Sequence, residues 1–138
     1  MSQKLNPIIL KASSSKKTEI RQIAARCFRD LPTLDLESQL TLFSLLYDTD
    51  DVSAQAIQSV AELSDKTWDK TIIRKVLERL FFHANSEKLN NKLATAYALN
   101  RLLKNEDIPK EKMLKTKEKL SSDKFYRVRK EAKITIGG

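Results

Sequence analysis

Residues 48–63 read DTDDVSAQAIQSVAEL, and this stretch decides the fold. Its apolar residues recur at steps of four, four and three, at Val52, Ala56, Val60 and Leu63. That spacing places them on one face of a helix, because an α-helix completes a turn in about 3.6 residues. The stretch therefore predicts an amphipathic helix that buries one face in a core.

Three aspartates precede this apolar run, at Asp48, Asp50 and Asp51. Carboxylates in that place accept hydrogen bonds from the free N–H groups of a first turn, and their charge meets the positive end of the helix dipole. We therefore expect them to cap the helix. Small residues within it allow a second helix to approach closely, so we expect the helix to lie between two neighbours: Ala54, Ala56 and Ala61.

Glycine is almost absent from the 138 residues, since Gly137 and Gly138 are the only two. Tight hairpins favour glycine at left-handed positions, so sheets are not expected. Phosphate-binding loops and the dinucleotide fingerprint also need glycine, which excludes nucleotide chemistry by those routes. A chain of this length fits one domain with a continuous core.

Helical periodicity recurs after a polar lead-in at residues 1–16, which we expect to be flexible or loosely docked. Residues 17–138 are predicted to form a single helical domain. Thr33 or Asp35 is the candidate cap of its second helix, whose predicted apolar face is Leu36, Leu40, Phe43, Leu46 and Tyr47. The seven predicted helices run through residues 20–31, 36–47, 50–63, 68–81, 89–103, 113–120 and 125–136.

Three of these runs share one pattern: Ile20-Ala24-Phe28-Leu31, Val52-Ala56-Val60-Leu63 and Val128-Ala132-Ile136. A fourth fits less well, because Lys92 and Asn100 stand where a core favours apolar side chains in Lys92-Ala96-Asn100-Leu103. The unit recurs at about 32 to 40 residues, a period typical of two-helix repeats.

At this point the chain resembles HEAT repeats, in which an aspartate is followed by a valine-arginine pair and by an alanine four residues after the valine. Asp123, Val128-Arg129 and Ala132 match closely, and Ile20-Arg21 with Ala24 matches in part. Asp50 or Asp51 with Val52 and Ala56 also matches, although Ser53 stands in place of the arginine. The resemblance implies an all-α solenoid of antiparallel helix pairs that binds proteins or nucleic acid, and the alternative is a compact helical bundle.

Charge is divided along the chain. Residues 31–65 carry seven acids and no Lys or Arg, whereas residues 66–138 carry nineteen bases and nine acids. A basic C-terminal end could attract phosphates or an acidic protein. The competing interpretation is that these lysines only solvate exposed helices and pair with Glu111, Glu118 and Glu131 three or four residues away.

The residues that usually carry chemistry are scarce. His83 and Cys27 are the only ones of their kind, which excludes a histidine metal cage or a tetrahedral thiolate site. We interpret Cys27 as a buried small hydrophobe, His83 as a helix-end cap and Trp68 as a packing residue. The aspartates near Thr49 lack the glycine and the later glutamate of an EF-hand. We therefore predict no enzyme, no cofactor and no metal site.

The functional hypothesis is a non-enzymatic binding module, scaffold or small subunit of an assembly. Its predicted partner is a protein with an acidic surface, and the alternative is nucleic acid bound through phosphate contacts. A third hypothesis joins the acidic segment of one copy to the basic end of another, head to tail. One cysteine, no secretory pattern and no membrane span predict a reducing compartment such as the cytoplasm. The predicted partner-binding residues are Lys124, Arg127, Arg129, Lys130 and Lys133.

Overall fold

A computed structural model describes residues 5–134, which form eight α-helices, one short 3-10 helix and no strand. The predicted all-α class is confirmed. One of the helices, α1, lies outside the seven expected from periodicity. The elements are α1 Leu5–Ala12, α2 Thr18–Cys27, the 3-10 helix η2 Phe28–Asp30, α3 Leu36–Leu45, α4 Asp50–Glu62, α5 Lys70–His83, α6 Leu89–Leu102, α7 Lys110–Leu120 and α8 Tyr126–Ala132.

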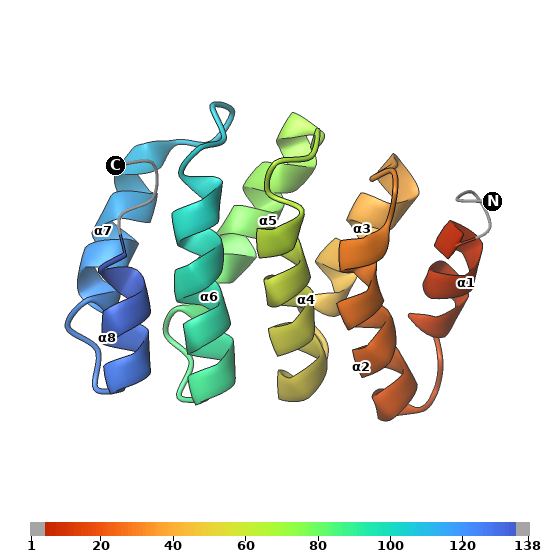
Figure 1. Cartoon of the computed structure of the whole chain (residues 1–138), viewed down its shortest axis with the longest axis horizontal. Helices are drawn as coiled ribbons and strands as arrows, with labels where there is room; N and C mark the ends of the chain where they lie inside the picture. The colour runs from red at the N-terminus through yellow and green to blue at the C-terminus, as the bar shows by residue number, and fades with distance from the viewer. Residues whose placement is uncertain (1–4, 135–138) are drawn as a thin grey trace.

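The helices lie in two rows. Figure 1 shows α2, α4, α6 and α8 side by side in one row, with α3, α5 and α7 behind them. Contacts follow the same order, because α4 packs between α2 and α6, and α6 packs between α4 and α8. Each helix of the front row also contacts the helix that precedes it in the chain. The prediction that α4 lies between two neighbours is confirmed, while its finer form, a HEAT-like solenoid, stays a prediction.

The stretch that sets the pattern buries the face that its spacing predicts. Val52, Ala56 and Val60 are fully buried, and Leu63 is 1% exposed. Burying such side chains contributes roughly 25 cal/mol for each Å² of apolar surface removed from water. The same holds for α5 and the residue Trp68 just before it, since every apolar residue of the predicted face is buried, through Leu80 to Phe81. In these two helices the apolar spacing alone identifies the core.

The predicted face of α3 is wrong in part. Leu46 is buried as predicted and Phe43 packs against the core, but the other predicted residues are exposed. Leu36 and Leu40 are 58% and 53% exposed, whereas Leu42 and Leu45 are buried together with the C-cap residue Leu46. α3 carries apolar residues around much of its circumference, so spacing cannot choose between two faces. The choice follows from packing, because α3 contacts α1, α4 and α5.

The expected lead-in contains the helix α1. Ile9 is 4% exposed and belongs to the hydrophobic core, and α1 contacts α2 and α3. Pro7 lies in the first turn, where the missing N–H breaks no helical hydrogen bond. Eight residues are too few to show a periodic pattern, so this part of residues 1–16 differs from the expectation of a loose segment.

Helix caps agree in part with the prediction. Asp35 caps α3, since its Oδ1 accepts a hydrogen bond from the Ser38 N–H at 2.8 Å. Asp48 does not cap α4 from its side chain, because the N-cap residue is Thr49 and the Asp48 carboxylate binds Arg21 instead. Asp50 and Asp51 make no side-chain cap either, but they occupy the first turn of α4, where their charge meets the positive end of the helix dipole as expected.

Candidate functional site

The five predicted partner-binding residues lie on α8 and on the residues that flank it, and the structure divides them into two groups. Lys124 forms an ion pair with Glu87, and Arg129 donates from Nη1 to the carbonyl oxygens of Asp123 and Lys124 at 2.7 and 3.1 Å. The remaining three are exposed and pair with no acid of residues 5–134: Arg127, Lys130 and Lys133.

The acids expected to neutralise these cations mostly do not. Glu111 pairs with Lys115 at 3.2 Å, as its spacing predicts. Glu118 and Glu131 form no ion pair with a described residue. Burial raises the pKa of Glu131, whose carboxyl group is partly withdrawn from water. The exposed cations of α8 therefore keep their charge unbalanced by their own helix.

A shared register relates the four helices of the front row. Their N-cap residues are Lys17, Thr49, Lys88 and Phe125. Four residues after each cap stand Arg21, Ser53, Lys92 and Arg129. This position leans toward the next helix of the row, so it can join one helix pair to the next.

The first three residues of this register each make such a link. Arg21 holds the Asp48 carboxylate in a two-point contact, with Nε to Oδ2 at 2.8 Å and Nη2 to Oδ1 at 3.0 Å. Ser53 accepts a hydrogen bond from the Asn91 amide at 2.8 Å. Lys92 Nζ lies 2.5 Å from Asp123 Oδ1. Successive helix pairs are thus joined by two ionic links with an uncharged link between them.

These links account for the acidity of their carboxylates. The hydrogen bond from Arg21 is the main cause that lowers the pKa of Asp48. For Asp123, burial favours a higher pKa, but the hydrogen bonds from Lys92 and from the Phe125 N–H outweigh it and the pKa is lowered. Both aspartates are therefore charged at neutral pH and serve the fold.

Arg129 repeats half of the Arg21 arrangement. Nη1 of Arg21 donates to the carbonyl oxygen of Ser15, six residues earlier, at 2.9 Å. Nη1 of Arg129 donates to the carbonyl oxygen of Asp123, also six residues earlier. Nε and Nη2, which hold Asp48 in the case of Arg21, have no hydrogen-bond acceptor among residues 5–134 in the case of Arg129.

A second position of the register distinguishes α8 from the other helices of its row. Eight residues after the cap stand Ala25, Ile57 and Ala96, which are at most 2% exposed. The equivalent residue after Phe125 is Lys133, which is exposed. At this position α8 therefore ends in an exposed charge, where the other three helices of the row have a buried apolar residue.

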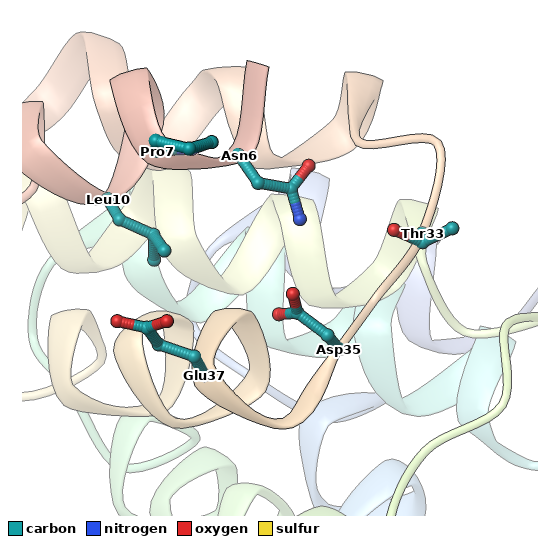
Figure 2. A pocket seen from close by; sticks show the side chains of 6 residues that line it. All are labelled: Asn6, Pro7, Leu10, Thr33, Asp35 and Glu37. Carbon is teal, nitrogen blue, oxygen red and sulfur yellow. The ribbon is translucent and has the colours of Figure 1, made fainter. Parts of the chain in front are cut away.

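Among the open hollows of the surface, two lie between helices of the N-terminal half and the centre of the row. Figure 2 shows the first, between α1 and α3, where Asn6, Asp35 and Glu37 are among the lining residues. The Asn6 amide donates to Ser38 Oγ at 3.3 Å, and its Oδ1 is buried without a partner among the described residues. The second hollow, of about 360 Å³, runs across α2, α4 and α6 and is lined by side-chain amides and arginines, including Gln22, Arg29 and Gln58. The second hollow is also lined by Asp51 and Arg26, and neither of them forms an ion pair with another described residue.

The residues considered as candidates for chemistry are His83, Trp68 and Cys27, and the contacts of the first two serve the fold. His83 is 5% exposed, and its Nε2 lies 2.8 Å from the carbonyl oxygen of Leu46, so it satisfies the C-terminal end of α3. Burial is the main cause that lowers its pKa. Trp68 is 5% exposed and donates to the Leu63 carbonyl at 2.9 Å, which confirms a packing role. Cys27 is a free, half-buried thiol.

The part of the chain that the structure describes has no cluster of His, Cys, Asp and Glu side chains suited to a metal ion. Within residues 5–134, no helix combines the length and the apolar character needed to cross a bilayer.

Lys92 and Asn100 are residues whose roles the sequence did not reveal. Both interrupt the apolar pattern of α6 in the sequence, yet Lys92 is 7% exposed and Asn100 is fully buried, so they do occupy the buried face. Lys92 reaches Asp123, and the Asn100 amide donates to the Glu131 carbonyl at 2.8 Å. The available signal was Asp123, an aspartate shortly before the next helix of the row, as Asp48 is shortly before α4.

Comparison with known proteins gives the fold alone. No protein-family model matches the chain, and no curated protein matches it. Among solved structures, it is similar to the crystal structure of an engineered protein that was a Northeast Structural Genomics Consortium target, with 20% sequence identity and a TM-score of 0.71. The match covers 90% of this chain and 57% of the engineered one.

Proposed function

We propose that this chain is a non-enzymatic protein-binding module, a scaffold or a small subunit of an assembly, that binds an acidic protein surface through α8. One observation carries the proposal: Arg127, Lys130 and Lys133 are exposed on or next to one short helix and pair with no acid of the described residues. Exposed charges of one sign attract and orient an oppositely charged surface and raise the rate of association. A free thiol at Cys27 supports a reducing compartment such as the cytoplasm as the place of action.

An acidic protein suits α8 better than a nucleic acid running along the row. α4 exposes Asp50, Asp51 and Glu62 in the same row of helices as α8. A phosphate backbone that followed this row would meet those carboxylates, whereas a protein partner can confine its acids to α8. Head-to-tail pairing of two copies is also less favoured, since the acidic segment, residues 31–65, forms the inner helices α3 and α4.

The test compares an acidic polypeptide with nucleic acids on matched variants. Poly-glutamate and duplex and single-stranded DNA and RNA are titrated at two salt concentrations against the wild type and the variant Arg127→Gln, Lys130→Gln, Lys133→Gln. The control variant removes the same charge elsewhere, at three exposed lysines without an ion pair: Lys66→Gln, Lys75→Gln, Lys104→Gln. We expect the wild type and the control variant to bind poly-glutamate, and the α8 variant to lose this binding.

Two results would contradict this function. Equal loss in both variants would show that only net charge matters. Nucleic-acid binding that falls steeply with salt, without poly-glutamate binding, would favour the alternative of phosphate contacts.

A further inference from the structure

The guanidinium of Arg129 is held in place, but of its nitrogens only Nη1 donates hydrogen bonds within the described residues. Two backbone carbonyls, those of Asp123 and Lys124, accept from Nη1 and hold the side chain against the turn before α8. The Arg129 guanidinium also lies over the Tyr126 ring, with 5.7 Å from its central carbon to the ring centre. Its Nε and Nη2 edge has no acceptor within residues 5–134.

Arg21 shows what the equivalent edge of the guanidinium binds within the fold. With the same Nη1 contact to a carbonyl six residues earlier, it presents Nε and Nη2 to both oxygens of Asp48. Lys92, at the same position of the register, also binds an aspartate. A planar guanidinium matches a carboxylate at two points, and such charge-assisted pairs are stronger than neutral hydrogen bonds.

We propose that Arg129 is a preformed receptor for one aspartate or glutamate carboxylate of the partner that α8 binds, gripped through Nε and Nη2 as Arg21 grips Asp48. This inference rests on the proposed function and specifies its chemistry. Lys130 and Lys133 supply longer-range attraction, and Arg129 supplies the directional contact.

The surroundings of Arg129 decide what kind of partner presents that carboxylate. A further helix packed as α4 packs on α2 does not fit, because Lys133 replaces the buried apolar residue at that position. The leading edge of a second copy does not fit either, since Ser15, Lys16 and Lys17 stand where Asp123 precedes α8. The occupant that fits is an acidic segment of a different protein.

The primary experiment observes the arginine side chains directly. The wild-type chain is titrated with an acetylated and amidated peptide that contains two aspartates, and with the same peptide carrying asparagines, while the Nε–Hε signals are followed by NMR. We expect the Arg129 signal to move with the aspartate peptide alone, and the Arg21 signal to stay because its carboxylate site is filled. An Arg129 signal that does not move, or that moves equally with the asparagine peptide, overturns the inference.

A pair of charge-preserving variants measures how much the two-point contact contributes to the affinity for the peptide. Arg129→Lys keeps the charge and loses the fork, and we expect about tenfold weaker binding of the aspartate peptide. Arg26→Lys, at an exposed arginine of α2 outside the proposed binding surface, is the matched control and should bind as the wild type does. Equal affinities for the two variants would overturn the role of Arg129, and stronger movement of the Arg129 signal with inorganic phosphate would overturn the preference for carboxylate.

The outcome is separable from that of the proposed function. If the triple glutamine variant of α8 weakens binding while Arg129→Lys does not, α8 remains the binding surface and the Arg129 contact is wrong. If the triple variant binds as tightly as the wild type, the proposed function itself fails.

Discussion

Lys92 on α6 and Asp123 before α8 form an ion pair that solvent hardly reaches. Nζ and Oδ1 lie 2.5 Å apart, and the side chains are only 9% and 11% exposed. The pair Lys115 and Glu111 on α7 differs in this respect, with side chains 73% and 84% exposed. Charges withdrawn from water depend on each other far more than exposed charges do, because little solvent screens them.

The replacement Asp123→Asn should therefore destabilise the protein strongly. It leaves the Lys92 charge without its carboxylate, and we expect a loss of about 2–4 kcal/mol in the free energy of unfolding. The matched replacement Glu111→Gln breaks only an exposed pair and should change stability by less than about 0.5 kcal/mol. Urea unfolding followed by the fluorescence of Trp68 measures both, and similar losses would contradict the difference in burial.

The replacement Ala56→Asp should unfold the protein or destabilise it by more than about 4 kcal/mol. Ala56 is fully buried on the helix that packs between α2 and α6, so a carboxylate there would lose its hydration without gaining a partner. Ala54 on the same helix lines the open hollow, and Ala54→Asp is the control. We expect its melting temperature to stay close to that of the wild type. A stable Ala56→Asp variant would show that the assignment of this face is wrong.

Stability should fall as the pH drops below the ordinary pKa of histidine, 6.5, because burial lowers the pKa of His83. The unfolded imidazole then binds a proton that the folded one resists, so the loss begins near that pH and continues toward the lower folded pKa. The neighbours of His83 include Arg79, whose charge lowers the pKa further, and Asp50, whose charge raises it.

His83 is the only histidine of the chain, so this slope of the unfolding free energy against pH can be assigned to it. Free energies of unfolding measured between pH 8 and pH 5 in the wild type and in His83→Gln provide the test. The slope should be reduced in the variant, and equal slopes would mean that other groups cause it.

Reversal of charge on α8 should leave the fold intact. Lys130 and Lys133 are exposed, and their amines make no hydrogen bond to another residue of 5–134, so Lys130→Glu with Lys133→Glu should change stability by less than about 0.5 kcal/mol. Binding of poly-glutamate should nevertheless be lost through repulsion. A thermal melt and a titration on the same sample check both points, and a large drop in melting temperature would show that these lysines serve the fold.

The sequence predicts those helices best that have a single apolar stripe. In α4 the spacing of Val52, Ala56 and Val60 identifies the buried face because the opposite face is polar. In α3 the apolar residues surround the helix, so Leu36 looked as suitable for the core as Leu42 although only Leu42 is buried. Which side is covered depends on neighbouring helices that are distant in the sequence.

The sequence predicts the candidate surface as a charged region. It does not predict which of its residues form ion pairs within the fold and which stay unpaired. Composition located the basic residues of α8, yet only the structure shows that Lys124 is paired with Glu87 while Lys130 has no such partner. The anchoring of Arg129 by two backbone carbonyls also depends on the shape of the preceding turn. Side-chain pairing across more than 30 residues of chain leaves no local pattern to read.

The hydrogen bond from Asn91 to Ser53 has a consequence for how the molecule comes apart. It joins α4 to α6 without charge, whereas the links on either side, Arg21 to Asp48 and Lys92 to Asp123, are ionic. Acid that protonates the two aspartates breaks the ionic contacts and spares an amide–hydroxyl contact. Because the pKa values of Asp48 and Asp123 are lowered from 3.8, acid below that pH should fray both flanks first. Amide hydrogen exchange would then report slow exchange in the centre and faster exchange on both sides.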